Sequence, residues 1–158
     1  MTVTLREIIT ANWQECVNLT LAPGQEHFVS SNAYSLAESK FQPTFVPLAI
    51  YAGEAMVGFV MYGYYPDGGP PLGQRFWIYR LMIDQGHQRK GYGRAAMREV
   101  IARLRATPDC PDVLIGYEPD NDAAARLYRE LGFEEIGPAP WGETLACLKL
   151  QAESRAGD

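Results

Sequence analysis

A short glycine-rich turn constrains the fold of this chain more than any other feature. Residues 88–95 read Gln-Arg-Lys-Gly-Tyr-Gly-Arg-Ala, follow the apolar, strand-like run 76–83, and open a segment with helical periodicity. The start of a helix leaves about four backbone N–H groups without an intrahelical acceptor and carries about half a positive charge. Glycine lets an anion approach these groups closely, and the basic side chains of the turn add positive charge. The strand, the turn and the helix together predict a phosphate-binding site.

The same turn also fits a looser pattern that is found in dinucleotide-binding proteins. Gly91 and Gly93, with Ala96, match the spacing G-x-G-x-x-A. A dinucleotide fold places this turn early in the chain and needs further β–α units, with an acid about 20 residues downstream. Here about 65 residues follow the turn and end in strand-like segments. The order of segments therefore argues against a dinucleotide site.

Hydrophobic periodicity divides the chain into strand-like and helix-like segments. The helix after the glycine turn carries apolar residues at i, i+3, i+4 and i+7, and it is expected to end before Pro108. Asn12 is expected to cap a short helix that runs to about Leu19. A longer helix is predicted over residues 25–39, and a further helix ends at Gly132. Strands are predicted at residues 2–9, 46–52, 56–64, 76–84, 113–118, 133–137 and 144–150.

Length and composition indicate one globular domain. The chain has 158 residues, of which 47% are apolar and 21% are charged. A chain of this length buries on the order of 70% of its unfolded surface. We expect a single domain at residues 1–150 and a polar, disordered tail at residues 151–158. No apolar run reaches about 18 residues and the first residues lack a signal-peptide core, so we expect a cytoplasmic protein that does not contact a membrane.

Net charge and cysteine usage argue against several classes of function. A net charge of −5 argues against nucleic acid as a partner and suits a small cationic ligand. Cys16, Cys110 and Cys147 are too few and too scattered for a disulfide framework or a zinc site. We therefore expect buried thiols in a reducing compartment, no bound metal, and no cysteine that acts as a nucleophile.

Several segments together resemble the GNAT family of N-acetyltransferases. The spacing Gln-x-x-Gly-x-Gly at residues 88–93 matches the acyl-CoA signature of that family, and residues 117–133 resemble the second half of its motif set. Residues 45–62 resemble its central hairpin, so the likeness covers nearly the whole chain. Within the family, the chain is most similar to the bacterial spermine and spermidine acetyltransferases, in residues 25–32, 57–62 and 78–84.

The resemblance implies a fold and a cosubstrate. The fold is α/β (α+β in its layering), a mixed, mostly antiparallel sheet of seven strands with helices on both faces. In this family the fourth and fifth strands separate at a bulge, and the pantetheine arm of acetyl-CoA enters the gap like an additional strand. Acetyl-CoA is thus the expected cosubstrate, with the pyrophosphate on the glycine turn. The predicted cofactor-binding residues are Leu81, Met82, Ile83, Gln88, Arg89, Lys90, Gly91, Tyr92, Gly93, Arg94, Asn121 and Tyr128.

Two of these residues also have a structural interpretation. Asn121 is a natural helix N-cap, which alone would account for it. Tyr128 lies on the apolar stripe of its helix and could be a buried core tyrosine. The resemblance implies instead that Asn121 faces the pantetheine or the acceptor, and that Tyr128 protonates the departing thiolate of CoA as a general acid.

A general base is harder to identify. An alkylammonium with a pKa near 10.4 must lose a proton before it attacks, which costs about 4.6 kcal/mol at pH 7. Glu118, at the end of the fifth predicted strand, is the best placed carboxylate, although it could equally be a solvated acid before Pro119. Tyr79 is an alternative that would pass the proton through water. Of the two histidines, His27 could line the acceptor cleft, whereas His87 is expected at the surface beside the phosphate turn.

These residues lead to a predicted reaction, the transfer of an acetyl group from acetyl-CoA to a primary amine by direct attack. The acceptor is predicted to be a small cation, a polyamine, bound by carboxylates and aromatic faces. Alternatives are an aminoglycoside, an amino acid or a peptide N-terminus as acceptor, or a CoA-binding sensor without catalysis. The oligomeric state is left open, with a homodimer as one expectation. The predicted acceptor-binding residues are Glu26, Tyr34, Trp77, Tyr79 and Glu118.

Overall fold

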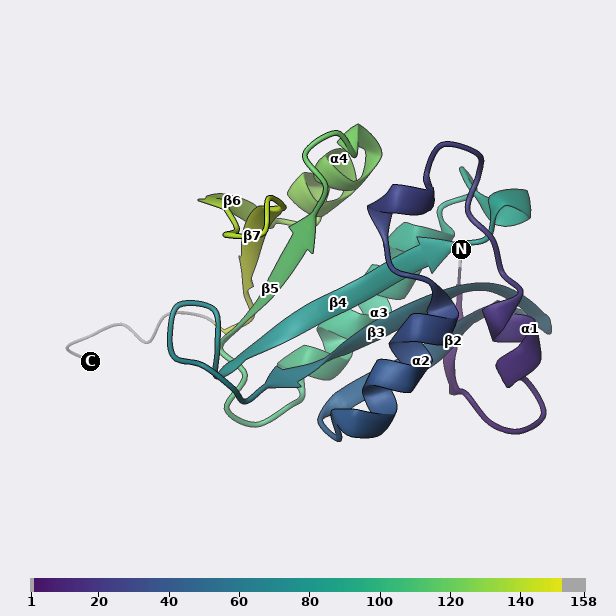
Figure 1. Cartoon of the computed structure of the whole chain (residues 1–158), viewed down its shortest axis with the longest axis horizontal. Coiled ribbons are helices and arrows are strands. Elements are labelled where there is room, and N and C mark those ends of the chain that lie inside the picture. The colour runs from purple at the N-terminus through teal and green to yellow at the C-terminus, as the bar shows by residue number, and fades with distance from the viewer. Residues whose placement is uncertain (1, 152–158) are drawn as a thin grey trace.

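A seven-stranded sheet forms the centre of the computed structural model, which describes residues 2–151 (Figure 1). Its order is β1-β2-β3-β4-β5-β7-β6, and neighbouring strands pair antiparallel except β4 and β5, which are parallel. The expected mixed, mostly antiparallel sheet is therefore confirmed. Beyond its first position, the predicted tail lies outside the described residues. The strands are β1 (Thr4–Glu7), β2 (Phe45–Ala52), β3 (Ala55–Tyr65), β4 (Arg75–Ile83), β5 (Asp112–Tyr117), β6 (Glu134–Pro138) and β7 (Thr144–Lys149).

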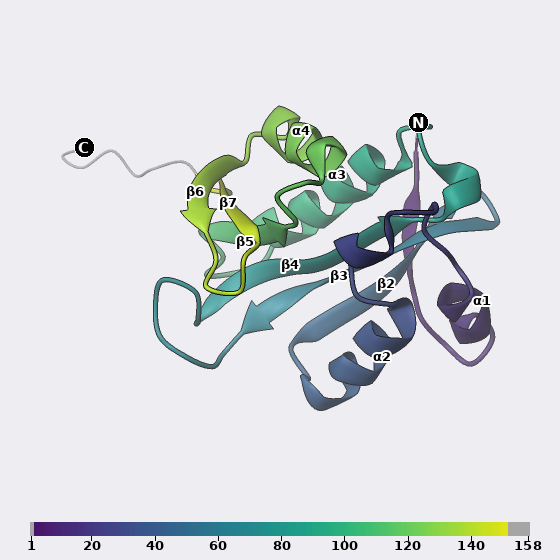
Figure 2. The ribbon, with the colours of Figure 1, turned by 45° about the horizontal axis from the view of Figure 1, so that its top comes forward.

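Helices cover both faces of the sheet, as expected (Figure 2). In β2, Leu48 and Ile50 face the core beneath α3 and α4, while Ala49 and Tyr51 face the core beneath α1 and α2. Successive side chains of a strand point to opposite faces, so a strand that is covered on both sides is apolar throughout. The helices are α1 (Trp13–Val17), α2 (Asn32–Phe41), α3 (Tyr92–Arg105) and α4 (Asp122–Glu130), with 3-10 turns at Glu26–Phe28 and Gln85–His87.

Helix α3 anchors the glycine turn to the sheet. Its predicted apolar stripe is fully or nearly fully buried, and burial of each such side chain contributes roughly 1.5–3 kcal/mol. The rigid packing of α3 holds its N-terminal turn in a fixed place at the end of β4. Across residues 2–151, no helix combines the length and the apolar character that crossing a bilayer would require. The stripe consists of Met97, Val100, Ile101 and Leu104.

The single helix predicted over residues 25–39 is wrong. A 3-10 turn at Glu26–Phe28 is followed by Val29 in an extended conformation (φ −152°, ψ 148°), and α2 begins only at Asn32. Ser31 ends the extended stretch because its hydroxyl accepts the backbone N–H of Tyr34 at 3.1 Å, which is an N-cap contact. This serine was the overlooked helix start signal.

The predicted cap of the first helix is also wrong in its detail. Asn12 precedes α1, but its side chain makes no capping hydrogen bond there. The side-chain oxygen Oδ1 of Asn12 accepts the backbone N–H of Ile9 at 2.7 Å, and its side-chain amide donates to the Glu7 backbone carbonyl at 3.0 Å. Asn12 therefore stabilises the preceding turn, and α1 ends at Val17.

Candidate active site

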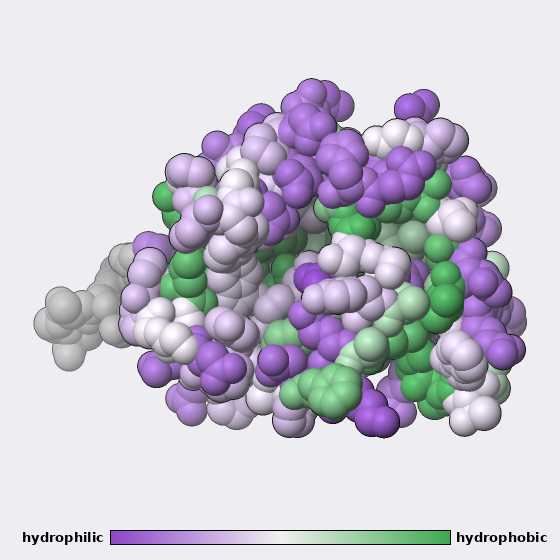
Figure 3. All heavy atoms as spheres, in the orientation of Figure 1, coloured by the Kyte–Doolittle hydropathy of each residue, from purple (hydrophilic) through white to green (hydrophobic). Residues whose placement is uncertain are grey.

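The site lies where β4 and β5 separate. Residue pairs join these parallel strands at two positions, Trp77 with Leu114 and Ile78 with Ile115. At the same place the pairing of β4 with β3 shifts by one residue, so that Tyr79 is the extra residue of a bulge. A cavity of about 880 Å³ opens beyond this point. Figure 3 shows a recess near the middle of this face, with apolar residues at its floor.

The open edge of β4 presents the backbone of alternate residues to this cavity. The Asp84 N–H donates to the Val57 carbonyl of β3 at 2.8 Å, and the Met82 carbonyl points at Gly58 of β3. Because backbone direction alternates along a strand, Leu81 and Ile83 must face the other way, into the cavity. The Met82 backbone therefore points toward β3 although the residue lines the cavity, and its contact with the cofactor stays a prediction. Leu81 and Ile83 lie as expected.

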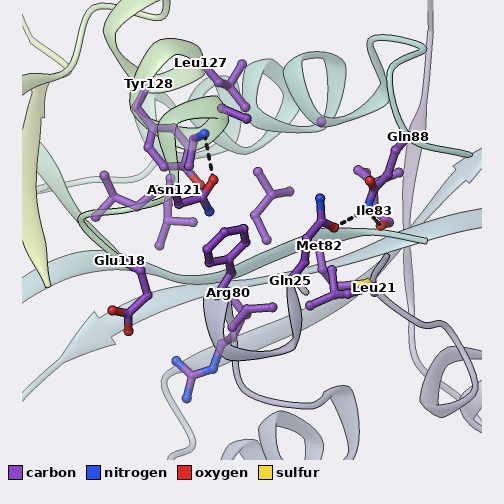
Figure 4. A pocket seen from close by; sticks show the side chains of 18 of the residues that line it. Leu21, Gln25, Arg80, Met82, Ile83, Gln88, Glu118, Asn121, Leu127 and Tyr128 are labelled. Carbon is purple, nitrogen blue, oxygen red and sulfur yellow. Dashed lines mark hydrogen bonds between the residues drawn. The ribbon is translucent and has the colours of Figure 1, made fainter. Parts of the chain in front are cut away.

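Gln88 holds the end of this open edge. Its side-chain amide donates to the Ile83 carbonyl at 3.0 Å and to Oε1 of Gln25 at 2.9 Å (Figure 4). These bonds connect the end of β4, the glycine turn and the segment before α2. Gln88 thus positions the turn through its own contacts, and Gln25 is a lining residue that the sequence analysis missed.

The glycine turn presents backbone donors to the cavity. Arg89 (φ 63°) and Gly91 (φ 84°) both have left-handed backbone conformations, and Gly91 caps α3 without a side-chain acceptor. Within residues 2–151, the N–H groups of residues 91–94 have no protein acceptor. A left-handed conformation costs a non-glycine residue such as Arg89 roughly 1–2 kcal/mol. This geometry can accept an anion such as a pyrophosphate.

The side chains of the turn take up different positions. Gln88, Arg89, Gly91, Tyr92, Gly93 and Arg94 all line the cavity, but Lys90 does not. Arg94 also forms an ion pair with Glu130 of α4, and this contact lowers the pKa of the Glu130 carboxyl. Arg94 therefore already has a counter-charge, whereas the backbone N–H groups of the turn have no acceptor within residues 2–151.

Helix α4 forms the opposite wall. The Asn121 side chain accepts the Ala124 N–H at 3.2 Å, so the capping interpretation is correct. Asn121 also lines the cavity, and its amide nitrogen has no partner among the residues described. Both interpretations of Asn121 are therefore compatible with its position.

Tyr128 lies deep in the same wall. It is 7% exposed, and its ring packs at 5.5 Å from that of Tyr117 and 5.8 Å from that of Phe133. Its hydroxyl has no hydrogen-bond partner in the described part of the chain, and the residue lines the cavity. Burial is the main cause that raises the pKa of the Tyr128 phenol above its ordinary value, and the nearby Tyr117 and Glu143 raise it further.

A raised pKa keeps the Tyr128 hydroxyl protonated, so it can donate a hydrogen bond or a proton. Proton transfer from a phenol (pKa near 10) to a thiolate (pKa near 8.5) is uphill by about 2 kcal/mol in water. Burial disfavours the phenolate further, but it also disfavours a free thiolate beside it. Tyr128 is thus suited to stabilise a thiolate as its charge develops.

The other end of the cavity carries different groups. Glu118 lies opposite Gln88, at the far side of the cavity in Figure 4. Tyr79 lines the cavity and stacks on Phe45 at 4.0 Å, and its buried hydroxyl has no partner within residues 2–151. Burial and the nearby Glu38 raise the Tyr79 pKa, so this tyrosine is not a base at neutral pH. It can pass a proton only as part of a hydrogen-bond chain.

Arg80 lines the cavity and is paired with Glu38, which does not line it. It donates to Glu38 at 3.2 Å and to the Tyr79 carbonyl at 3.0 Å, while its buried Nε has no partner in the described chain. A carboxylate that is already paired with a guanidinium offers little to a second cation.

Three predicted acceptor residues do not line the cavity. The Glu26 carboxylate accepts the Gly24 N–H at 2.9 Å, and Tyr34 is 59% exposed on α2. Trp77 precedes the divergence of the strands, is 7% exposed, and donates its ring N–H to the Leu72 carbonyl at 2.9 Å. Trp77 is therefore a core residue. Tyr79 and Glu118 do line the cavity.

Both histidines line the cavity, including His87, which was expected at the surface. His27 also forms a 2.9 Å contact with Asp120, and this contact links the segment before α2 to the loop before α4. The contact thus joins the two walls of the cleft.

Trp141 and Glu143 are lining residues that the sequence analysis missed. Both belong to the loop between β6 and β7. Because Tyr117 of β5 pairs with Thr144 of β7, this loop lies beside the end of β5. Strand order could have predicted this position, but no local motif marks it.

Cysteine and metal chemistry find no support in the described residues. No cysteine lines the cavity, and burial raises the pKa of both Cys16 and Cys110 to about 11. Neither thiol is therefore a thiolate at neutral pH. Between residues 2 and 151, no group of three histidine, cysteine, aspartate or glutamate side chains is arranged to hold a metal ion.

Comparisons with known proteins agree with this geometry. The sequence model described as "Acetyltransferase (GNAT) family" matches residues 5–133. The spermine/spermidine N(1)-acetyltransferase of Bacillus subtilis (strain 168) is 26% identical over 138 residues, 87% of this chain and 91% of that protein. The N-alpha-acetyltransferase RimI of Mycobacterium tuberculosis is 32% identical over 68 residues, 43% of this chain and 39% of that protein.

Solved structures show the same fold. The spermidine N-acetyltransferase of Vibrio cholerae in complex with CoA and spermine has a TM-score of 0.73 at 15% identity, covering 94% of this chain and 96% of that one. The structure of AAC(6')-Ib with parmomycin and acetyl-CoA has a TM-score of 0.78 at 17% identity, covering 100% of this chain and 99% of that one. At these identities the likeness concerns the fold alone.

Proposed function

Since this chain belongs to the GNAT family and is an acyl-CoA-dependent N-acetyltransferase, we propose that it acetylates a primary amine of a polyamine. One observation carries the choice of acceptor. The cavity has backbone donors and arginines at the glycine turn, whereas Glu118 lies opposite Gln88 (Figure 4) and Glu143 lies beside Gly116 of β5. The first set suits the phosphates of CoA, and the second suits a cation.

Acetyl-CoA is the cosubstrate, and we assign its contacts as follows. The pyrophosphate lies on the N–H groups of residues 91–94, and the pantetheine runs along the backbone of Leu81 and Ile83. This path brings the thioester toward Tyr128, between the two walls. A backbone N–H of the open β4 edge polarises the thioester carbonyl.

The reaction is a direct transfer. The neutral amine attacks the thioester carbonyl carbon, a C–N bond forms, and the carbonyl oxygen takes up negative charge. When the tetrahedral intermediate collapses, the C–S bond breaks and the thiolate leaves. Tyr128 donates its hydroxyl hydrogen to that sulfur. Before the attack, the ammonium loses one proton through Glu118 or through water beside Tyr79. As the intermediate collapses, its nitrogen loses a second proton, which returns to the Tyr128 phenolate.

The sequence relatives favour a polyamine over the other acceptors. The relative named a spermine/spermidine N(1)-acetyltransferase matches 87% of this chain, whereas the N-alpha-acetyltransferase RimI matches 43% of it. The net charge of −5 also favours a cationic acceptor. Because an aminoglycoside is a polycation too, the experiment must distinguish an aminoglycoside acceptor from a polyamine acceptor.

The release of the free CoA thiol measures the rate of acetyl transfer to each amine directly. We expect kcat/KM for spermidine to exceed that for butylamine by about 10-fold or more at low salt, because a second ammonium finds a second carboxylate. Added salt should reduce the ratio, since exposed charges are screened. Equal values for spermidine and butylamine, or a higher value for an aminoglycoside, would contradict the proposal. Saturable CoA binding without turnover on any amine would indicate a sensor.

A further inference from the structure

Glu143 occupies the point where the cleft begins. Ile115 is the last β5 residue that pairs with β4, and Gly116 follows it directly. A Cβ atom placed on Gly116 would lie 3.1 Å from Oε1 of Glu143 and 3.4 Å from its carboxyl carbon. The absence of a side chain at Gly116 therefore makes room for this carboxylate beside the first open position of β5.

The same carboxylate lies close to the proton donor. Glu143 is one of the groups that raise the pKa of Tyr128, and both residues line the cavity. Tyr128 is 7% exposed and lines the cavity, and its hydroxyl has no hydrogen-bond partner within residues 2–151, so it is available to a ligand in the cavity. A ligand between these two residues meets a neutral donor on one side and a negative charge on the other.

The loop holds Glu143 in place and leaves part of it free. The Trp141 ring N–H donates to Oε1 at 2.5 Å, and the Ala139 N–H donates to the Glu143 carbonyl at 2.7 Å. Oε2 has no protein donor in the described part of the chain. Trp141 itself is 56% exposed and lines the cavity, so its ring face is available to a cation.

From this arrangement we propose that Glu143 is the specificity-determining carboxylate of the acceptor site. Its free Oε2 accepts a hydrogen bond from the acceptor's cationic amine, and Trp141 fixes Oε1 and covers the bound ammonium. Glu118, at the end of β5, then serves a more distant ammonium of the same acceptor. This assignment rests on the proposed amine acetylation and adds the residue that selects a cation.

Two variants test the charge and the position of this carboxylate separately. Glu143→Gln keeps the shape and an oxygen that can accept the Trp141 N–H, but it removes the charge. We expect kcat/KM for spermidine to fall about 20-fold, with the dissociation constant of CoA unchanged. Gly116→Ala keeps the charge but displaces the carboxylate by a few tenths of an ångström, and we expect a fall of about 3-fold. Gly116 does not have a positive φ, so alanine fits its backbone.

Glu99→Gln is the matched control. Glu99 is exposed on α3, outside the cavity, and the substitution changes the net charge by the same amount. It should leave kcat/KM unchanged. A Glu143→Gln variant that is folded, binds CoA normally and stays within 2-fold of the parent on spermidine would overturn the assignment.

The outcomes also separate this inference from the proposed function. If the parent enzyme shows no preference for spermidine but Glu143→Gln lowers kcat/KM for every charged amine, the polyamine proposal fails and the role of Glu143 stands. If the parent prefers spermidine and Glu143→Gln keeps both that preference and its rate, the role of Glu143 fails and the polyamine proposal stands.

Discussion

The two ends of the cavity differ in the groups that they present, backbone groups at one end and side chains at the other. At the glycine turn, the groups proposed to bind acetyl-CoA are backbone groups of two adjoining segments, the open edge of β4 and the start of α3. At the opposite end, they come from the side chains of Tyr79, Glu118, Trp141 and Glu143, which lie on three separate parts of the chain. The first end is one continuous stretch of sequence, whereas the second exists only in the folded molecule.

This difference has a consequence for substrate choice. A backbone site changes little when side chains change, so it suits a cosubstrate that is constant. A side-chain site on loops can change its charge or shape by one substitution while the sheet stays intact. We therefore expect substitutions at the turn to change the affinity for acetyl-CoA alone. Substitutions near β5 should change kcat/KM for the amine alone.

Tyr128→Phe should have the largest effect, because Tyr128 is the proposed proton donor to the departing thiolate. Loss of the hydroxyl should lower kcat about 100-fold while the affinity for CoA stays the same. Tyr64→Phe is the matched control, since the Tyr64 ring packs on that of Phe76 at 5.2 Å and does not line the cavity. The measurement is kcat under conditions in which chemistry limits the rate. Equal kcat values for both variants would reduce Tyr128 to a packing residue.

Gly91→Val should separate the two ends most clearly. Valine at a φ of 84° is strained and its side chain blocks the approach of the phosphate, so CoA affinity should fall about 30-fold, or about 2 kcal/mol. The KM for the amine should change little. Gly53→Val is the control, because Gly53 (φ 61°) has a similar conformation in the β2–β3 turn with open space around it. Calorimetric titration with CoA is the measurement, and an unchanged affinity would refute the pyrophosphate site.

Gln88→Leu should have a smaller effect at the same end. It removes the donor to the Ile83 carbonyl and the link to Gln25, which should weaken CoA binding about 5-fold. Gln85→Leu removes a comparable bond, to the Thr20 hydroxyl at 3.0 Å, outside the cavity. If both variants bind CoA as the parent does, Gln88 does not position the turn.

Asp120→Asn should have the smallest effect. The His27–Asp120 contact joins the two walls, but both side chains are more than half exposed, and such pairs contribute at most about 1 kcal/mol. The dissociation rate of CoA should rise by less than about 3-fold, and high salt should remove the difference. Glu54→Gln breaks the exposed Arg6–Glu54 pair far from the cleft and serves as control. A rise above 10-fold in stopped-flow measurements would show that the contact closes the cleft.

Local sequence determined the cofactor end, the strands and most of the helices. The turn at residues 88–94 could be interpreted directly, because its donors, glycines and charges are neighbours in the chain. The α3 stripe was equally clear, since its period of 3.6 residues is set by the backbone itself. Where a single side chain decided a boundary, as Ser31 does before α2, periodicity alone placed the helix start too early.

Tertiary structure alone decided the end of the cavity that carries Glu118 and Glu143. Trp77 and Glu38 have the residue types that a polyamine site needs, yet one is buried before the strands diverge and the other is paired with Arg80. Trp141 and Glu143 have no motif, yet the pairing of β7 with β5 carries them into the cavity. A charge or an aromatic ring acts through its distance and its surroundings, and in a sheet whose strand order departs from chain order these are fixed only when the strands pair.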